Sequence, residues 1–297
     1  MSKLEYYLKE ALEPTLMYAA LCSVLGIIAA SYYYKVSLAM AILLVIGVFF
    51  AQMSVNVIDD YVDYKRGIDS ETEKTKFSGG SGILVNHLLE PREVLYMGLT
   101  AFMIAASIGS YLIALKPAIM PFVAVGALSI LLYAHFFVNI PYLAEPLAAT
   151  NFMLIVLGSF VVAGSLTHLL AALLVAFPTG SLVGLALLVN EIPDRDVDAK
   201  HGRRSGVVML NSREKSASYY IIWQALCYGS VVYGVAAKIL PYTELLLLAA
   251  LPFMVVTYSG IRRYSKAREF EKYMGTNALH SLLVPMLLMV GYVMVIV

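Results

Sequence analysis

The sequence predicts an all-α, polytopic membrane protein with nine transmembrane helices around a central cavity. Of its 297 residues, 60% are hydrophobic and 14% are charged, whereas about 25% of an average soluble domain is charged. The mean hydropathy is +0.78. Apolar stretches of about 20 residues, enough for a helix to cross a bilayer, recur from near residue 15 to the last residue. We therefore expect residues 1–297 to form a single transmembrane domain, and a soluble protein with one core is excluded.

Apolar windows bounded by charged residues, Pro and Gly define the expected helices in order. The charged, amphipathic segment 1–13 lacks the apolar core and cleavage site of a signal peptide, so we expect it to lie along the membrane surface. The polar ends of the second and sixth helices keep helical spacing, which predicts that both project beyond the bilayer. The nine expected spans are residues 15–34, 36–58, 94–115, 117–137, 146–166, 168–192, 216–237, 241–260 and 277–297.

The distribution of basic residues predicts the orientation. With a cytoplasmic N-terminus, 18 of the 21 Lys and Arg residues fall on the cytoplasmic side, and only Lys35, Lys116 and Lys238 fall on the other. This asymmetry is what the positive-inside rule requires. We expect a multi-pass protein of the cell membrane, in contact with membrane lipids. The net charge of +1 gives no field that would favour a nucleic-acid partner.

All seven aspartates lie in two short segments. One segment follows the second span and the other follows the sixth, so both are predicted at the cytoplasmic face. The connections after them, residues 59–93 and 193–215, are longer than ordinary connections. We expect these two loops to form a cytoplasmic cap over a site. The aspartates are Asp59, Asp60, Asp63 and Asp69 in the first segment, and Asp194, Asp196 and Asp198 in the second.

Helical spacing groups the polar residues of each segment. At about 100° per residue, Asn56, Asp59, Asp60 and Asp63 share one helix face. In the second segment Asn190, Asp194 and Asp198 follow i, i+4, i+8 spacing, and Asp196 points elsewhere. Pro193 removes a helical hydrogen bond, which predicts a kink or a restart of the helix at that position.

Clustered carboxylates at the edge of a low-dielectric medium repel one another, and a divalent cation removes that conflict. Carboxylate and amide oxygens without His or Cys favour Mg²⁺, with Mn²⁺ as a second possibility. Two opposed clusters suggest two ions that bridge a diphosphate. The alternative, carboxylates that only cap helix C-termini, conflicts with the negative end of the helix dipole. The predicted metal ligands are Asn56, Asp59, Asp60, Asp63, Asn190, Asp194 and Asp198.

Basic side chains beside both clusters could hold phosphate oxygens, with Arg binding them in bidentate fashion. The alternative is that these charges only set the membrane topology. Several stand next to Gly- or Ser-containing turns, such as Ser78-Gly-Gly-Ser-Gly82, whose backbone N–H groups can approach an anion. The predicted diphosphate-binding residues are Arg66, Lys76, Lys200, Arg203 and Arg204, together with Asn56 and Asn190.

At these residues the chain resembles the UbiA superfamily of intramembrane prenyltransferases. Asp59-Asp60-Tyr61-Val62-Asp63, continued by Gly67-x-Asp69, is similar to that superfamily's first motif. The stretch from Asn190 to Ser205, NEIPDRDVDAKHGRRS, is similar to the second motif of its menaquinone-type branch, NNxRDxxxDxxxGKRT. Asp59 stands where the family usually has Asn, so either Asn56 or Asp59 fills that role; Glu191 and Pro193 also depart from the pattern.

The resemblance implies Mg²⁺-dependent transfer of an isoprenoid chain from a polyprenyl diphosphate to a lipophilic or aromatic acceptor. Asp60, Asp63, Asp194 and Asp198 would then be catalytic, since they neutralise charge on the leaving diphosphate. An aromatic acceptor of menaquinone-type biosynthesis is favoured over a glycerol-phosphate lipid, and an ion-coupled transporter is the non-enzyme alternative. Side chains that could face the acceptor or the allylic cation are Tyr61, Asp69, Tyr133, Tyr142 and Asn151.

Overall fold

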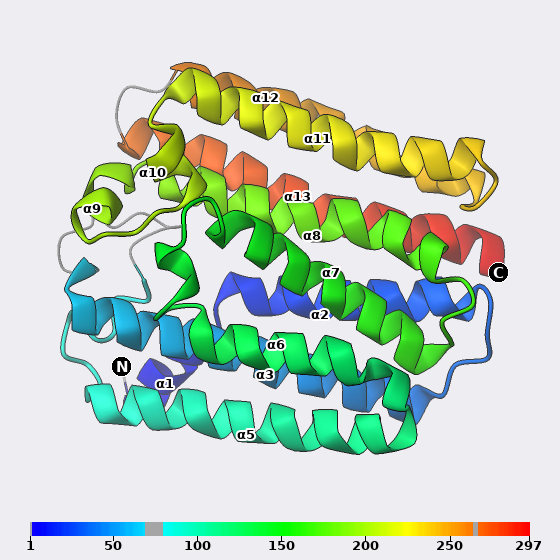
Figure 1. Cartoon of the computed structure of the whole chain (residues 1–297), viewed down its shortest axis with the longest axis horizontal. Coiled ribbons are helices and arrows are strands. Elements are labelled where there is room, and N and C mark those ends of the chain that lie inside the picture. Colours follow the sequence, from blue (N-terminus) through cyan, green and yellow to red (C-terminus); the bar gives the residue numbers. More distant parts are fainter. Residues whose placement is uncertain (1, 69–79, 264–266) are drawn as a thin grey trace.

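A computed structural model describes residues 2–68, 80–263 and 267–297 of the chain. Within those ranges it contains helices and no β-strand. Successive long helices run back and forth along a common direction, and Figure 1 shows them stacked as an extended bundle. The helices are α1 (Lys3–Ala11), α2 (Pro14–Ser31), α3 (Leu38–Arg66), α5 (Pro91–Leu115), η1 (Pro117–Ile119), α6 (Met120–Leu132), η2 (Phe137–Asn139), α7 (Ala144–Ala163), α8 (Leu169–Glu191), α9 (Arg195–Lys200), α10 (Gly206–Leu210), α11 (Arg213–Ala236), η3 (Tyr242–Ala250), α12 (Leu251–Arg263) and α13 (Ala267–Ile296).

Seven helices in the described ranges are long and apolar enough to cross a membrane. They are α2, α3, α5, α7, α8, the continuous η3–α12 segment Tyr242–Arg263, and the part Glu269–Ile296 of α13. The expected spans 117–137 and 216–237 correspond to a shorter apolar helix, Pro117–Leu132, and to α11, which lies outside this set. The chain is therefore a multi-pass helical membrane protein.

The last helix begins about ten residues earlier than the sequence predicts, at Ala267 instead of residue 277. Phe270 and Met274 are one turn apart and fully buried in a cluster with Leu188, Tyr220 and Ile261. An apolar pair at i, i+4 spacing lets a polar stretch continue as a helix, because one face is packed while the other is exposed. The charged residues between the eighth and ninth expected spans are therefore partly helical.

Close packing of α7 against α8 fixes the position of the second acidic segment. A Cβ added at Gly180 would collide with the backbone oxygen of Ala149, and one at Gly184 would lie 2.5 Å from the backbone oxygen of Glu145. Small residues at i, i+4 spacing let two membrane helices approach this closely. The C-terminal end of α8 is thereby held against the start of α7.

Local signals in the sequence set the ends of the helices around the site. Pro14 and Pro91 occupy the first turns of α2 and α5, where a missing N–H costs nothing. Helix α3 continues through the first acidic motif and ends at Gly67, whose φ of 80° is the left-handed cap. Helix α8 stops at Glu191 and the chain resumes as α9 at Arg195, so a restart follows Pro193.

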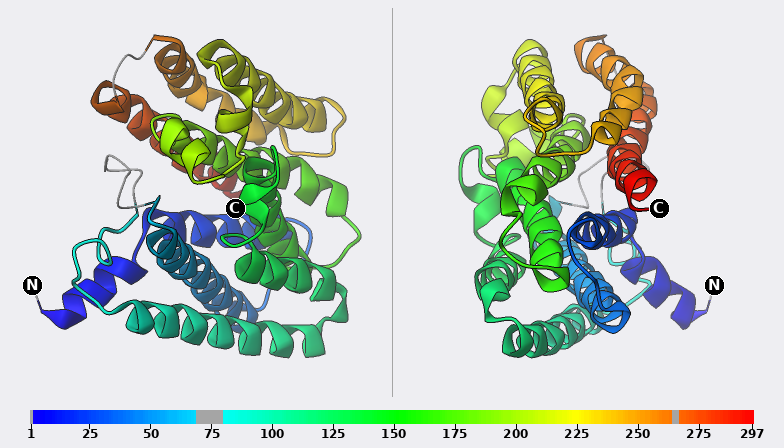
Figure 2. Two further views of the ribbon diagram at one scale, coloured as in Figure 1. Left: turned by 60° about the vertical axis from the view of Figure 1, so that its left-hand side comes forward. Right: turned by 90° about the vertical axis from the view of Figure 1, so that its right-hand side faces the viewer.

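Figures 1 and 2 show the acidic end of α3, helices α9 and α10, and helix α1 at the same end of the bundle. The connections 32–37, 164–168 and 237–241 lie at the opposite end (Figure 1). At that far end Lys116 donates hydrogen bonds to the backbone oxygens of Val161, at 3.0 Å, and Gly164. A positive charge there complements the C-terminal dipole of α7.

Candidate active site

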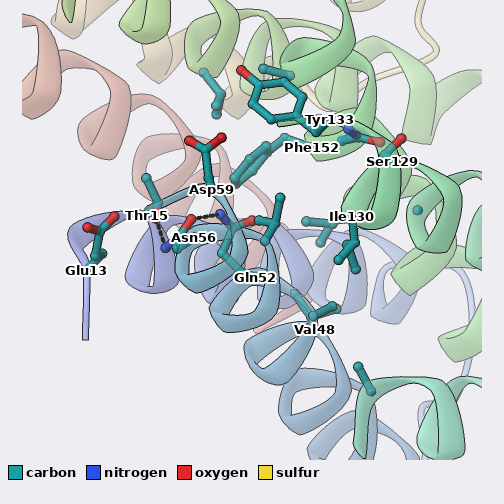
Figure 3. A pocket seen from close by; sticks show the side chains of 18 of the residues that line it. Glu13, Thr15, Val48, Gln52, Asn56, Asp59, Ser129, Ile130, Tyr133 and Phe152 are labelled. Carbon is teal, nitrogen blue, oxygen red and sulfur yellow. Dashed lines mark hydrogen bonds between the residues drawn. The ribbon is translucent and has the colours of Figure 1, made fainter. Parts of the chain in front are cut away.

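A cavity of about 920 Å³ is lined mainly by α3, α5, α6, α7 and α8, with the start of α2 at its polar end. Its polar end contains five aspartates drawn from the two motifs, and Figure 3 shows Asp59 and Asn56 on α3 facing Tyr133 and Phe152 across it. Its other end is apolar and lined by residues such as Leu44, Ile108, Leu112, Ile119 and Val162. Leu44 and Asp60, sixteen residues apart on α3, are separated by about 24 Å along the helix. The cavity therefore joins a charged mouth to a long apolar interior.

The first acidic segment is a continuous part of α3 with its polar residues on the cavity side. Asn56, Asp59, Asp60 and Asp63 all line the cavity. The amide of Asn56 is held on both sides: its Nδ2 donates to Thr15 Oγ1 at 2.6 Å, and its Oδ1 accepts from Gln52 Nε2 at 2.8 Å (Figure 3). Asn56 is thus fixed in orientation by α2 and by the preceding turn of α3.

The second acidic segment spans the break between α8 and α9. Asn190, Asp194 and Asp198 line the cavity, together with Glu191. Asp196 instead points outward and pairs with Arg195 at 2.9 Å, its side chain 85% exposed. The structure therefore brings the predicted residues of both motifs to one cavity and leaves out the one aspartate that the helical spacing excludes.

Arg203 lies between the two acidic segments. Its guanidinium contacts Asp63 through Nη2 and lies 3.7 Å from Asp198 Oδ1 through Nε. Burial raises the pKa of Asp198 to about 6, while Arg203 acts in the opposite direction. A single buried cation thus contacts one carboxylate from each motif, and the site combines positive charge with clustered oxygen ligands.

Asp60 is contacted from outside α3 by a residue of the connection that follows it. Ser81 Oγ lies 2.5 Å from Asp60 Oδ2 and 2.6 Å from Glu10 Oε2 on α1. The backbone N–H of Ser81 also donates to Asp60, at 3.2 Å to Oδ1. Burial, and then the neighbouring Asp60, raise the pKa of Glu10 to about 8. The first motif is therefore connected to α1 through Ser81.

Several of the predicted phosphate-binding residues lie outside the cavity. Arg66 donates to the backbone oxygen of His135 at 3.0 Å, and Lys200 and Arg204 are exposed; none of these three lines the cavity. The backbone of Arg204 is paired with the 138–142 segment, through Val138 O and Tyr142 N. Lys76 lies outside the described residues. Of the predicted basic residues that the structure describes, Arg203 alone lines the cavity.

The predicted acceptor-side residues likewise divide into those that line the cavity and those that do not. Tyr133 and Asn151 line the cavity, and Asn151 Oδ1 is buried with no hydrogen-bond partner among the described residues. Tyr61 packs outside it, with Lys65 Nζ 5.9 Å from its ring centre. Tyr142 is 48% exposed and its hydroxyl points to Met209 O. Asp69 lies outside the described residues.

Three charged residues of the segment before α2, Lys9, Glu10 and Glu13, were not predicted at the site. Lys9 and Glu13, which flank the turn between α1 and α2, line the cavity, and Glu10 lies behind Ser81. Glu145 on α7 is buried and accepts a hydrogen bond from Gly206 N at 2.6 Å, which fastens the start of α10 to the bundle. The pair Glu10-x-x-Glu13 before the first span was the available signal, but the sequence does not show that this segment folds against α3.

The donor set at the polar end fits a hard divalent cation. It consists of carboxylate and amide oxygens, and Asp63 Oδ1 and Glu191 Oε2 are buried without hydrogen-bond partners in the described ranges. No group of three or more acidic, His or Cys side chains among those residues converges closely enough to form a complete cage. Mg²⁺ typically takes one or two carboxylates, with waters and substrate phosphates supplying the rest. Such a donor set therefore leaves coordination positions that waters and a phosphate ligand can fill.

Two acidic helix ends face each other at the mouth of an apolar cavity in a membrane-embedded helical bundle. This arrangement defines a class of enzyme whose substrates have an anionic head and a lipophilic chain. The chain belongs to the UbiA prenyltransferase family, whose model matches residues 19–283. It is a prenyltransferase, and this excludes the transporter alternative.

Individual relatives agree with this assignment. The chain is 25% identical over 229 residues to the 1,4-dihydroxy-2-naphthoate octaprenyltransferase of Bacillus subtilis (strain 168), covering 72% of this chain and 69% of that protein. It shares its fold with a UbiA homologue from Aeropyrum pernix K1 (TM-score 0.70, 18% identity, 95% and 98% of the two chains). A digeranylgeranylglyceryl phosphate synthase structure (0.69, 15%, 99% and 100%) and a UbiA homologue from Archaeoglobus fulgidus bound to DMAPP and Mg²⁺ (0.66, 15%, 97% and 99%) share the fold as well.

Proposed function

We propose that this prenyltransferase transfers the isoprenoid chain of a polyprenyl diphosphate to an aromatic acceptor of menaquinone-type biosynthesis, in a reaction that depends on Mg²⁺. The observation that carries the proposal is the single cavity with a polar mouth and an apolar interior. Its two ends match the two chemically different halves of such a donor. Apolar walls along α3, α5, α6 and α7 would bury the isoprenoid chain, and burial of apolar surface is favourable.

The diphosphate would lie between the two acidic segments. We assign Asp60, Asp63, Asp194 and Asp198 to hold the metal ions, assisted by Asn56, Asp59 and Asn190, and Arg203 to bind diphosphate oxygens. Arg66, Lys200 and Arg204, which lie outside the cavity, remain proposed as diphosphate residues, as does Lys76. When bound, Mg²⁺ stabilises the negative charge that develops on the leaving diphosphate.

Bond cleavage leaves an allylic cation that water must not reach before the acceptor does. The apolar walls of the cavity would shield the cation from water, and the faces of Tyr133 and Phe152 near the polar end are suited to stabilise positive charge. The acceptor carbon would then form the new bond to the isoprenoid chain, the cleaved diphosphate would leave, and the acceptor's proton would pass to a carboxylate of the two acidic segments. We propose that Asn151 and Tyr133 orient the acceptor, because the unpartnered Oδ1 of Asn151 can accept a hydrogen bond from it.

A glycerol-phosphate lipid is the second candidate acceptor. The observation that favours it is the fold shared with a digeranylgeranylglyceryl phosphate synthase over nearly the full length of both chains. We place it second because the Asn190–Ser205 motif and the Bacillus subtilis relative both point to a naphthoate acceptor.

The distribution of charge supports an orientation with the polar end of the cavity at the cytoplasmic face. Of the 21 basic residues in the sequence, 18 fall on the expected cytoplasmic side. We propose that α11 and the η1–α6 segment also cross the membrane, which gives nine spans. We propose that the loops after the second and sixth expected spans, residues 59–93 and 193–215, form the cytoplasmic cap.

The test uses purified protein in detergent or nanodiscs with a labelled polyprenyl diphosphate and each acceptor class in parallel. Product is expected with the dihydroxynaphthoate in Mg²⁺, none is expected in EDTA, and re-addition of Mg²⁺ should restore it. Product with the glycerol-phosphate lipid alone would replace the first acceptor by the second. Undiminished turnover in EDTA would overturn the metal assignment.

A further inference from the structure

Helix α1 is amphipathic, with an apolar face and an opposite face that carries Glu10. Leu4, Leu8 and Leu12 are spaced by one turn and are 66%, 48% and 56% exposed. This stripe suits a helix lying at the membrane surface, with its apolar face toward lipid. Glu10 lies on the opposite face and is 1% exposed. Glu10, unlike the exposed Glu5 of the same helix, is therefore turned toward the bundle, where the Ser81 hydroxyl lies 2.6 Å from its Oε2.

Contacts independent of Glu10 already hold α1 against α3 and α5. Lys3 Nζ forms an ion pair with Glu93 at 2.6 Å. Tyr6 and Tyr7 pack against the cluster that contains Val57 and Val94. Attachment of the helix thus does not need a buried carboxyl group, and burial of one beside Asp60 is unfavourable by itself.

Ser81 brings Glu10 and Asp60 together. Its hydroxyl oxygen is 2.6 Å from Glu10 Oε2 and 2.5 Å from Asp60 Oδ2, and it accepts a hydrogen bond from Ile83 N at 3.0 Å. The Ser81 N–H points at the same Asp60 carboxylate. Asp60 and Ser81 line the cavity, whereas Glu10 does not. Glu10 therefore contacts the site through Ser81, from one layer behind it.

We propose that Ser81 and Glu10 are positioning residues for Asp60, which fix the rotamer of this carboxylate toward the metal–diphosphate site. The inference rests on the proposed function, since Asp60 is there assigned as a metal ligand. Hydrogen-bonded partners behind a ligating carboxylate typically contribute 10–100-fold to metal affinity or activity. The surface helix α1 is in this way a component of the active site, joined to it by one serine hydroxyl.

The experiment measures Mn²⁺ binding by electron paramagnetic resonance, with inorganic diphosphate present, for the purified full-length chain. Ser81→Ala and Glu10→Ala are expected to weaken Mn²⁺ binding by about 10–100-fold. Glu10→Gln keeps a polar group of the same length that can hydrogen-bond Ser81, so it should bind within about threefold of wild type. The matched controls are Glu5→Gln, an exposed residue of α1, and Ser107→Ala, an exposed residue of α5.

Thermal unfolding without metal accompanies each variant, because a purely structural role of Glu10 would lower stability and leave Mn²⁺ affinity unchanged. That result, or Mn²⁺ binding by Ser81→Ala equal to wild type, overturns the inference. An equal loss in Glu10→Gln and Glu10→Ala also overturns it, since it would mean that the charge of Glu10 binds metal directly. The variant Asp60→Ala distinguishes failure of this inference from failure of the proposed function. If Asp60→Ala binds Mn²⁺ like wild type, the proposed function fails as well.

Discussion

The aspartates at this site are distinguished by where their side chains point. Asp194 and Asp196 are two residues apart, yet Asp194 lines the cavity and Asp196 is exposed beside Arg195. Position on the helix surface, and not proximity in sequence, decides which carboxylate can contact a diphosphate between the two segments.

Asp194→Asn should therefore lower kcat by about 10²–10³-fold, the loss typical when one electrostatic stabiliser of a transition state is removed. The substitution keeps the size of the side chain and removes its charge. Asp196→Asn is the matched control and should retain wild-type kcat. Both are measured as steady-state turnover of a labelled polyprenyl diphosphate, and an equal loss in the two variants would contradict the assignment.

At the scale of elements, the cavity depends on how closely its walls approach. Gly126 of α6 lines it, and a Cβ added there would have open space around it. The apolar interior is thus wide at this point, and a larger side chain can enter it without displacing the backbone.

Gly126→Leu should narrow the interior and shift donor preference toward shorter isoprenoid chains. We expect kcat/KM for a long donor to fall on the order of tenfold relative to a short one, comparable to other pocket-size effects. Gly229→Leu, on the exposed side of α11 and also in open space, should leave the ratio unchanged. A constant ratio of the two donors in Gly126→Leu would show that the chain does not pass this residue.

Helix α8 shows the opposite case, because its glycines are already in close contact with α7. A Cβ at Gly184 would lie 2.5 Å from the backbone oxygen of Glu145, and backbone atoms cannot easily move away. Gly184→Val should destabilise the protein by at least about 1–3 kcal/mol, as overpacking typically does. Thermal unfolding in detergent tests this, with Gly229→Val as the tolerated substitution.

At the scale of the whole molecule, charge is divided between the two ends of the bundle. Most of the basic residues that the structure describes lie toward the end that contains the acidic site, whereas Lys116 and the connections that contain Lys35 and Lys238 lie at the other end (Figure 1). The few charged residues thus define both the catalytic end and the expected orientation.

This division predicts opposite labelling of two single-cysteine variants by a membrane-impermeant maleimide. In intact cells Lys238→Cys should react, and Arg213→Cys should react only after permeabilisation. Cys22 and Cys227 are buried and give a low background. Reaction of Arg213→Cys from outside intact cells would reverse the proposed orientation.

The sequence by itself determined the membrane fold, most helix positions and the two acidic motifs. Hydropathy and the 3.6-residue period are local properties of the chain, so they can be read without knowing which helices touch. The same period correctly separated Asp196 from Asp194 and Asp198. The family followed from the spacing of these motifs, since both lie within single segments.

Contacts between distant segments were decided only by the tertiary structure. Arg203 contacts Asp63 from 140 residues away, and Ser81 joins Asp60 to Glu10, a residue of the segment expected to lie along the membrane surface. The polar start of α13 is helical because Phe270 and Met274 pack in a buried cluster. Such contacts depend on which helix faces pack against each other. This packing joins residues far apart in the chain, so no local pattern in the sequence predicts it.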